Sequence, residues 1–212
     1  HNNGNTEQEK YEEGIFVGYR YFDTFGVPVR YGFGYGLSYT QFEIETEKVC
    51  VDRTGRVTVS VKVTNCGDTF PGREVVQIYV SLPEGRLEKE RRRLCAFAKT
   101  KELAPGESQR IEMTCGAENM ASYDERRASW ILEPGCYGIF VGDSLDASVV
   151  KEALELSEEK ILTVAENICP LEETLNELSL DVEEKRMLYD ELALQISGVP
   201  KTAYDLTGRQ TE

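Results

Sequence analysis

Residues 57–80, VTVSVKVTNCGDTFPGREVVQIYV, contain two predicted β-strands joined by a turn. In the first strand four valines alternate with polar residues, as in a strand that buries one face. These valines are Val57, Val59, Val61 and Val63. Asn-Cys-Gly-Asp at 65–68 predicts the turn. The second strand, over 74–80, places Val76, Ile78 and Val80 on one face.

The same pattern of short strands continues along the chain. Ala-Pro-Gly-Glu at 104–107 and Glu-Pro-Gly at 133–135 predict further turns. The further strands are expected at 94–98, around Ile111, Met113 and Cys115, at 130–132 and at 137–141. Trp130 is expected to face the core. About seven short strands over 43–145 indicate an all-β sandwich of about 100 residues.

Residues 11–42 are rich in aromatic residues and glycines and show little periodicity. A strand over 15–22 and a turn over 24–28 are expected. Because so short a segment cannot bury its rings on itself, we expect an extended arm that packs against a neighbouring domain. Stacking of these rings on a sugar is the less favoured alternative. The expected interdomain packing residues are Phe16, Tyr19, Tyr21, Phe22, Phe33 and Tyr35.

The C-terminal third divides into an ambiguous segment and a helix. Residues 146–166 fit either a helix or strands, and strands are favoured. Pro170 can start a short helix through Leu178. Asp181 and Glu184 resemble a capping box. The helix that follows is expected to bury Met187, Leu188 and Leu192 and to stop at Gly198, leaving 201–212 frayed.

The chain is acidic, and the charge is uneven. The net charge is −14, and residues 146–212 hold 16 Asp and Glu against 6 Lys and Arg, a net −10. This balance argues against nucleic-acid and anionic-membrane partners. No apolar run approaches the ~20 residues of a membrane-spanning helix.

The six cysteines are scattered, without a CxxC pair, and His1 is the single histidine. The ligand pairs of an ordinary zinc site are therefore missing, and no metal or other cofactor is expected. Six cysteines fall short of the density of a disulfide scaffold, so reduced thiols are favoured over bridges. This favours a cytoplasmic over a secreted location, which otherwise stays open. Cys66 is interpreted as an inert thiol in a turn.

Three stretches together resemble the family 3 glycoside hydrolases. The first two are EGIFVGYRYFD at 13–23 and GFGYGLSYTQF at 32–42. The third is the sandwich, with VTNCGDTFPGREVVQIYV at 63–80, LAPGES at 103–108, SYDE at 122–125 and WILEPGCYGIFVGD at 130–143. The sequence departs from the family pattern at 91–97, RRRLCAF, where the family tends to have proline and lysine-glycine-phenylalanine.

The resemblance implies a fibronectin type III-like, immunoglobulin-like β-sandwich. It divides the chain into an arm at 1–36, leading from an α/β domain, a sandwich at 37–145 and an acidic extension at 146–212. Family members hydrolyse β-linked glycosides with an aspartate nucleophile on a (β/α)8 barrel and an acid/base carboxylate on the α/β domain. Neither motif occurs here, so no catalytic residue is assigned and substrate-binding residues stay open.

The leading expectation is an accessory module of a β-glucosidase-like hydrolase, with the barrel and α/β domains of the same polypeptide as partners. A homodimer through the arm is a further expectation. The chain resembles a protein shortened at its N-terminus, and the extension suits either a linker to a downstream barrel, as in some bacterial members, or a plain tail. The alternative function is a free-standing carbohydrate- or protein-binding module.

Several charged groups have two interpretations, one functional and one structural. Arg20 and Asp23 are interpreted as a local ion pair rather than substrate ligands. Tyr123-Asp124-Glu125 is interpreted as a turn beside Trp130 rather than an acid/base group. The basic cluster is interpreted as a solvated loop, with an acidic partner or the acidic tail as the alternative. Its members are Arg86, Lys89, Arg91, Arg92 and Arg93.

Overall fold

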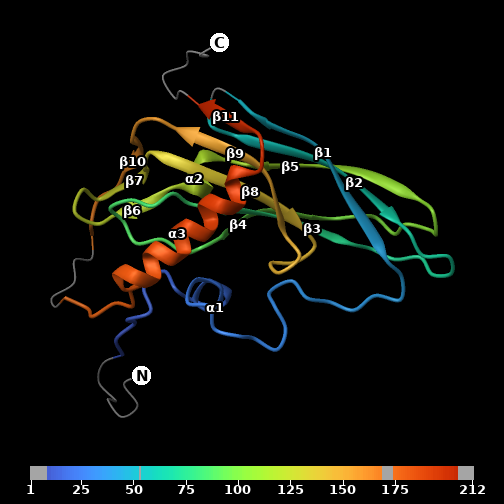
Figure 1. The fold of residues 1–212 in the computed structure, drawn as a ribbon, viewed down its shortest axis with the longest axis horizontal. Coiled ribbons are helices and arrows are strands. Elements are labelled where there is room, and N and C mark those ends of the chain that lie inside the picture. The colour runs from blue at the N-terminus through green and yellow to red at the C-terminus, as the bar shows by residue number, and fades with distance from the viewer. Residues whose placement is uncertain (1–8, 53, 169–173, 205–212) are drawn as a thin grey trace.

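The computed structural model describes residues 9–52, 54–168 and 174–204, which form a β-sandwich with a helix across one face (Figure 1). The helices are α1 (Tyr19–Thr24), α2 (Ala117–Met120) and α3 (Val182–Ser197). The strands are β1 (Phe42–Val51), β2 (Val57–Asn65), β3 (Val75–Ser81), β4 (Arg93–Lys99), β5 (Ser108–Cys115), β6 (Ser122–Asp124), β7 (Ser129–Leu132), β8 (Gly135–Gly142), β9 (Val149–Leu156), β10 (Lys160–Val164) and β11 (Lys201–Tyr204).

Two sheets enclose the main core, and this confirms the all-β prediction. One has the order β1-β2-β5 and the other β11-β9-β8-β3-β4. Every second residue of β2 is buried, as its alternation predicts. Val59 lies opposite Met113 and Val61 opposite Ile111 in the antiparallel register with β5. These side chains and the inward-facing ones of β3 and β8 belong to one buried cluster.

A third, smaller sheet has the order β10-β7-β6. Trp130 on β7 is 44% exposed, whereas its neighbours Ser129 and Ile131 are buried. The expectation that Trp130 faces the core is therefore wrong. Successive residues of a strand point to opposite faces, and Ile131 occupies the inward position. Trp130 instead stands beside its cross-strand partner Tyr123.

The strands expected within 146–166 are confirmed as β9 and β10. β9 pairs with β8, and β10 pairs with β7. Because Ala153, Leu154 and Leu156 of β9 are buried in the core, the sandwich continues beyond the expected boundary at residue 145. The tail then adds β11, which runs parallel to β9. The predicted fraying is therefore wrong for Lys201–Tyr204, and residues 205–212 lie outside the described part.

α3 follows the predicted capping box. The Asp181 carboxylate accepts hydrogen bonds from the backbone N–H groups of Glu183 and Glu184, and the Glu184 side chain accepts one from the Asp181 N–H. Gly198 ends the helix, as predicted. The short helix expected from Pro170 is absent over residues 174–178, and its start lies outside the described residues.

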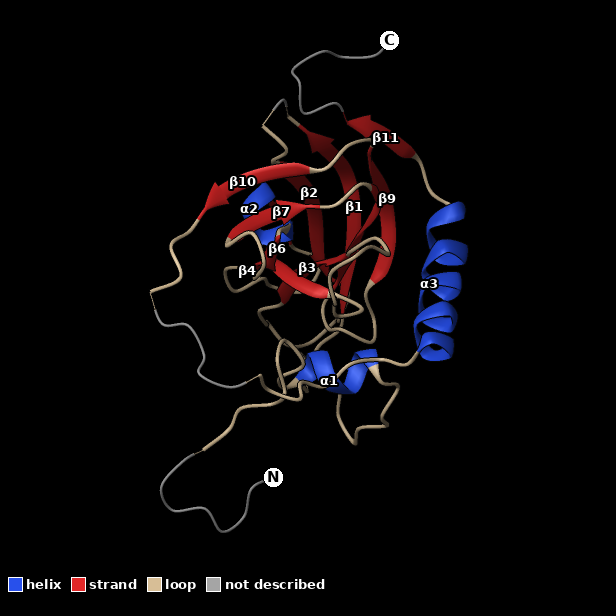
Figure 2. Ribbon diagram, turned by 90° about the vertical axis from the view of Figure 1, so that its left-hand side faces the viewer, coloured by secondary structure: helices blue, strands red, loops and turns tan. Residues whose placement is uncertain are grey.

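α3 lies across the outer face of the five-stranded sheet (Figure 2). Leu188 and Leu192 are buried as predicted, but Met187 is 64% exposed, and Ile196 takes the third inward position. Ile196 approaches the sheet closely at Gly138 of β8. A Cβ there would lie 3.0 Å from the Ile196 Cγ1 atom, so the glycine makes room for the helix.

The arm also packs on this outer face. The strand expected over 15–22 is wrong, because α1 occupies Tyr19–Thr24 after a turn at Gly18, whose φ is 62°. A second buried cluster joins β3, β8, α3 and the arm. It contains Tyr79, Phe140, Leu145, Leu180, Leu188 and Leu192, with Tyr19, Phe25, Leu94, Val150 and Tyr189 packed against it.

Candidate functional site

Polar contacts fix the arm to the loop before β4 and to the start of β4. The Leu94 N–H donates to the Tyr19 hydroxyl at 2.8 Å, and the Arg91 N–H donates to Thr24 Oγ1 at 3.0 Å. The Arg92 guanidinium donates to both Asp23 oxygens, at 3.1 and 2.6 Å. Such two-point pairing holds the arm in one orientation.

The predicted Arg20–Asp23 ion pair is wrong. Asp23 pairs with Arg92, and Arg20 lies 3.5 Å from a carboxylate oxygen of Glu90. Arg93 binds the same Glu90 through two hydrogen bonds, at 2.6 and 3.0 Å. Burial acts to raise the pKa of Glu90, but the hydrogen bonds and charge of Arg93 outweigh it, and the pKa lies below its usual range.

The interpretation of the basic cluster as a solvated loop is also wrong. Arg91 makes a two-point contact with Glu191 of α3, and Lys185 of α3 lies 2.5 Å from Glu88. The alternative, that the cluster binds the acidic tail, is confirmed for Arg91 and for Arg86, which lies 3.7 Å from Glu159. α3 is thus held to the sheet by apolar packing and to the loop by ion pairs.

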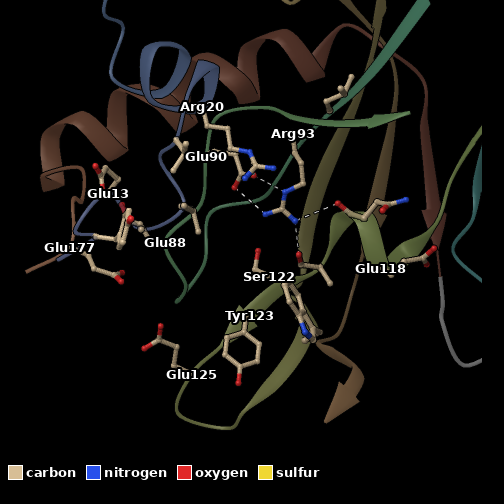
Figure 3. A pocket seen from close by; sticks show the side chains of 18 residues that line it. Glu13, Arg20, Glu88, Glu90, Arg93, Glu118, Ser122, Tyr123, Glu125 and Glu177 are labelled. Atoms are coloured by element: carbon tan, nitrogen blue, oxygen red, sulfur yellow. Dashed lines mark hydrogen bonds and ion pairs between the residues drawn. The ribbon is translucent and has the colours of Figure 1, made fainter. Parts of the chain in front are cut away.

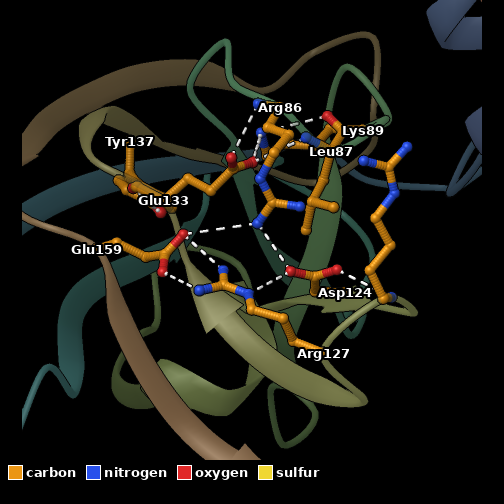
Figure 4. Close-up of polar contacts among 9 residues, drawn as sticks. Arg86, Leu87, Lys89, Asp124, Arg127, Glu133, Tyr137 and Glu159 are labelled. Atoms are coloured by element: carbon orange, nitrogen blue, oxygen red, sulfur yellow. Dashed lines mark hydrogen bonds and ion pairs between the residues drawn. The ribbon is translucent and has the colours of Figure 1, made fainter.

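A second ionic network joins the loop to the small sheet (Figure 4). Asp124 accepts from Arg86 at 2.8 Å and from Arg127 at 2.6 Å. The hydrogen bonds from these two arginines hold the pKa of Asp124 well below its usual range. Asp124 therefore stays ionised, and its carboxylate is already paired with the two arginines. Lys89 pairs with the buried Glu133 at 2.5 Å in the same region.

The arm leaves a row of rings uncovered after it has docked. Phe22, Phe33 and Tyr35 are exposed, whereas Tyr19 and Tyr21 are half-buried. Phe16 is only 2% exposed and packs edge-on against Phe25, so its ring is covered by this chain itself. Five of the six expected packing residues are therefore accessible at least in part.

An open groove of about 530 Å³ runs beside these rings. Its apolar lining includes Tyr19, Phe22, Val29, Tyr31 and Phe33. The expected set did not include Tyr31 and Val29. Periodicity could not identify these two residues because the segment has none. The density of apolar residues in this part of the arm is the signal that marks them.

The exposed apolar surface continues to the far end of the sandwich. Leu37 and Tyr39 are almost fully exposed, and the Tyr39 ring lies 6.0 Å from that of Phe70 in the β2–β3 loop. Exposed apolar residues in such number normally mark a contact site. We call the exposed side chains of Phe22, Val29, Tyr31, Phe33, Tyr35, Leu37, Tyr39 and Phe70 the aromatic surface.

A separate pocket of about 780 Å³ lies between the arm and the small sheet (Figure 3). Arg20, Glu90 and Arg93 form an ion-paired part of its wall. Tyr123 and Trp130 form another part, with ring centroids 5.3 Å apart.

The described residues contain no group of three or more His, Cys, Asp and Glu side chains that could hold a metal ion. Five cysteines are free thiols, and Cys169 lies outside the described residues. None of the helices in the described ranges is long and apolar enough to span a membrane.

Comparison with known proteins places this geometry. The Fibronectin type III-like domain family matches residues 74–145. Beta-glucosidase A of Butyrivibrio fibrisolvens is 41% identical over an alignment of 204 residues, and the match covers 85% of this chain and 23% of that protein. A beta-glucosidase of Ruminococcus albus is 42% identical over an alignment of 164 residues, and the match covers 74% of this chain and 17% of that protein.

Solved structures agree. A beta-glucosidase from Paenibacillus barengoltzii superposes with a TM-score of 0.73 at 38% identity, over 78% of this chain and 19% of that one. Beta-glucosidase 3B from Thermotoga neapolitana gives a TM-score of 0.66 at 39% identity, over 71% and 21%. The chain spans less than a quarter of the length of these relatives. It contains a fibronectin type III-like domain and is related to the family 3 glycoside hydrolases of the β-glucosidase type.

Proposed function

We propose that this chain is an accessory module that braces the catalytic domains of a family 3 glycoside hydrolase acting on β-linked glycosides. The observation that supports this role is the aromatic surface, which stays exposed after the arm has docked. Rings held on a fixed backbone lose little side-chain entropy on binding and bring a large apolar area. Such a surface suits a permanent neighbour.

The contacts that attach the arm to the sandwich support the same role. Asp23, Thr24 and Tyr19 tie α1 to the sandwich, so a domain that contacts Phe22 or Phe33 is held at a fixed distance from the sheets. Domain interfaces within one chain commonly bury about 600–1,500 Å². A row of eight exposed apolar side chains can contribute substantially to such an area.

Complementation of a relative tests the proposal. The Ruminococcus albus beta-glucosidase, shortened by the region that matches this chain, is mixed with the chain, and hydrolysis of an aryl β-glucoside is measured. We expect the mixture to regain activity that neither component shows alone. The double variant Phe22→Ser/Tyr35→Ser should lose this effect.

The control variant is Phe97→Ser, because Phe97 is 70% exposed on β4 and lies outside the aromatic surface. It should complement as well as the wild type. Equal complementation by the Phe22/Tyr35 variant would contradict the bracing role. Turnover by the chain alone, abolished by changing one of its own carboxylates, would contradict the assignment as an accessory module.

A free-standing binding module is the second candidate, supported by the separate pocket beside Trp130. Hydrogen exchange distinguishes the two. Bracing predicts faster exchange over 26–39 in the chain alone and protection once the shortened relative is added. Equal exchange in both samples favours the free-standing module. Protection that rises with the concentration of the chain alone indicates a homodimer through the arm.

A further inference from the structure

The pocket beside the small sheet contains an aromatic pair that the sandwich core does not use. Tyr123 of β6 and Trp130 of β7 face each other across the antiparallel register. Their ring centroids lie 5.3 Å apart, with 52° between the ring planes. Because the planes are tilted, the pair forms a corner, with the partly exposed indole as one wall and the phenol as the other.

Unused hydrogen-bonding groups line the same pocket. Among the described residues, Glu118 and Glu125 make no ion pair and no side-chain hydrogen bond, and the Asn119 side-chain amide and the Tyr123 hydroxyl make no hydrogen bond. Carboxylates only accept, whereas the amide and the phenol can also donate. The rim therefore offers both donors and acceptors beside an apolar ring face.

We propose that this pocket binds a neutral pyranoside, such as one residue of a β-linked oligosaccharide. A pyranose ring has an apolar C–H face, which packs on an indole, and a rim of hydroxyls that both donate and accept. The Trp130–Tyr123 corner and the rim supply these two complements side by side. The cavity volume of about 780 Å³ falls in the range of small-molecule sites.

The charges of the pocket narrow the class of sugar. Six glutamates line it, against two arginines, Arg20 and Arg93, and both arginines contact Glu90. Glu88 is paired with Lys185 of α3. The carboxylates that remain repel anions, so uronic acids and sugar phosphates are disfavoured. Neutral sugars need no compensating charge. The proposal concerns binding only, and Trp130 is assigned as its stacking residue.

The single tryptophan of the chain makes the test direct. Its fluorescence reports on this pocket without interference from another indole. Titration of the chain with cellotetraose should give a saturable change with a dissociation constant of about 1 mM, typical of a weak site. Galacturonic acid oligomers of the same length should give no saturable change.

Variants locate the site by calorimetry or by NMR, which do not need the indole. Trp130→Ala and Tyr123→Ala should each weaken cellotetraose binding by about tenfold or more, since each removes one wall. Phe97→Ala removes a more exposed ring from another strand and should bind as the wild type does. Thermal melts of each variant distinguish a loss of binding from a loss of folding. Trp130→Phe keeps an aromatic ring and should retain part of the affinity.

Three results would overturn the proposal. One is no saturable response to cellotetraose up to about 20 mM, far above the expected constant. Another is equal loss of binding in the Phe97→Ala variant. The third is binding of a lysine-rich peptide or tetramethylammonium without binding of the sugar, which would make the pocket a cation site. Because the chain is tested alone, each failure leaves the bracing role untouched.

Discussion

The two faces of β3 show two ways in which this chain buries a strand. The inward face carries Val76, Ile78 and Val80, which pack against the opposite sheet. The outward face carries Gln77, Tyr79 and Ser81, which are also buried, under the arm and α3. An alternating strand normally leaves its polar face to water. Here that face is covered by a second layer, which consists of the arm and α3.

The layers differ in what holds them. The inner layer is apolar and has strands as neighbours, so its contacts follow from alternation. The outer layer combines apolar packing with ion pairs, such as Asp23–Arg92 and Arg91–Glu191, between residues far apart in the sequence. Tyr79 sits in this layer with its hydroxyl donating to Gln77, and burial raises its pKa well above the usual range. We therefore expect the inner layer to contribute most of the stability and the outer layer to hold the arm and α3 in position.

The largest effect is expected from the inner layer. Ile78→Ala removes a fully buried side chain and should lower the free energy of unfolding by about 2–5 kcal/mol. Urea denaturation followed by circular dichroism checks this. Phe97→Ala, exposed on the neighbouring strand, should cost about 0.5 kcal/mol or less. If both variants melt alike, the inner layer is not the stabilising one.

An intermediate effect is expected where the arm meets the sandwich. Arg92→Met leaves the Asp23 carboxylate without its main partner in a largely buried position and should cost about 1–3 kcal/mol. The double variant Arg92→Met/Asp23→Leu should recover part of that loss, because neither charge is then stranded. Hydrogen exchange should rise over 19–25 and stay unchanged over 57–65. Equal loosening of both segments would show that the layers are not separable.

Acid should separate the layers further. The hydrogen bond from Arg91 holds the pKa of Glu191 below its usual range, and that of Glu90 is lowered as well. A depressed carboxylate pKa contributes stability above the ordinary value of about 4.3, and this is lost as the pH falls through the folded pKa. As the pH falls from 5 to about 2, α3 should therefore loosen before β2, and hydrogen exchange measures the order. Simultaneous loss would contradict the division, since the β2 valines do not titrate.

The smallest effect is expected at Trp130. Because nearly half of the side chain is exposed, Trp130→Ala should cost about 1 kcal/mol or less in denaturant melts. A loss near 3 kcal/mol, the usual figure for a buried tryptophan, would place the indole in the core after all. Ile131→Ala is the matched control, since that side chain is buried and should cost about 2–5 kcal/mol.

How much of the site was predictable can be seen from single residues. Phe22 and Phe33 were selected for ring density and are exposed on the arm, whereas Phe16, selected on the same grounds, is buried against Phe25. Composition reports that rings need cover but not which surface covers them. The residues of the pocket rim could not be grouped from the sequence for a similar reason. Asn119 follows β5 and Trp130 lies on β7, so only the fold brings them together.

The sequence by itself determined the strands in which apolar and polar residues alternate, the turn at 104–107 and the capping box of α3, because each depends on residues a few positions apart. Only the tertiary structure decided that the arm packs as a helix on the outer face, that Arg91 meets Glu191 and that Trp130 points outward. Those outcomes depend on contacts between distant segments, whose free energies outweigh weak local preferences.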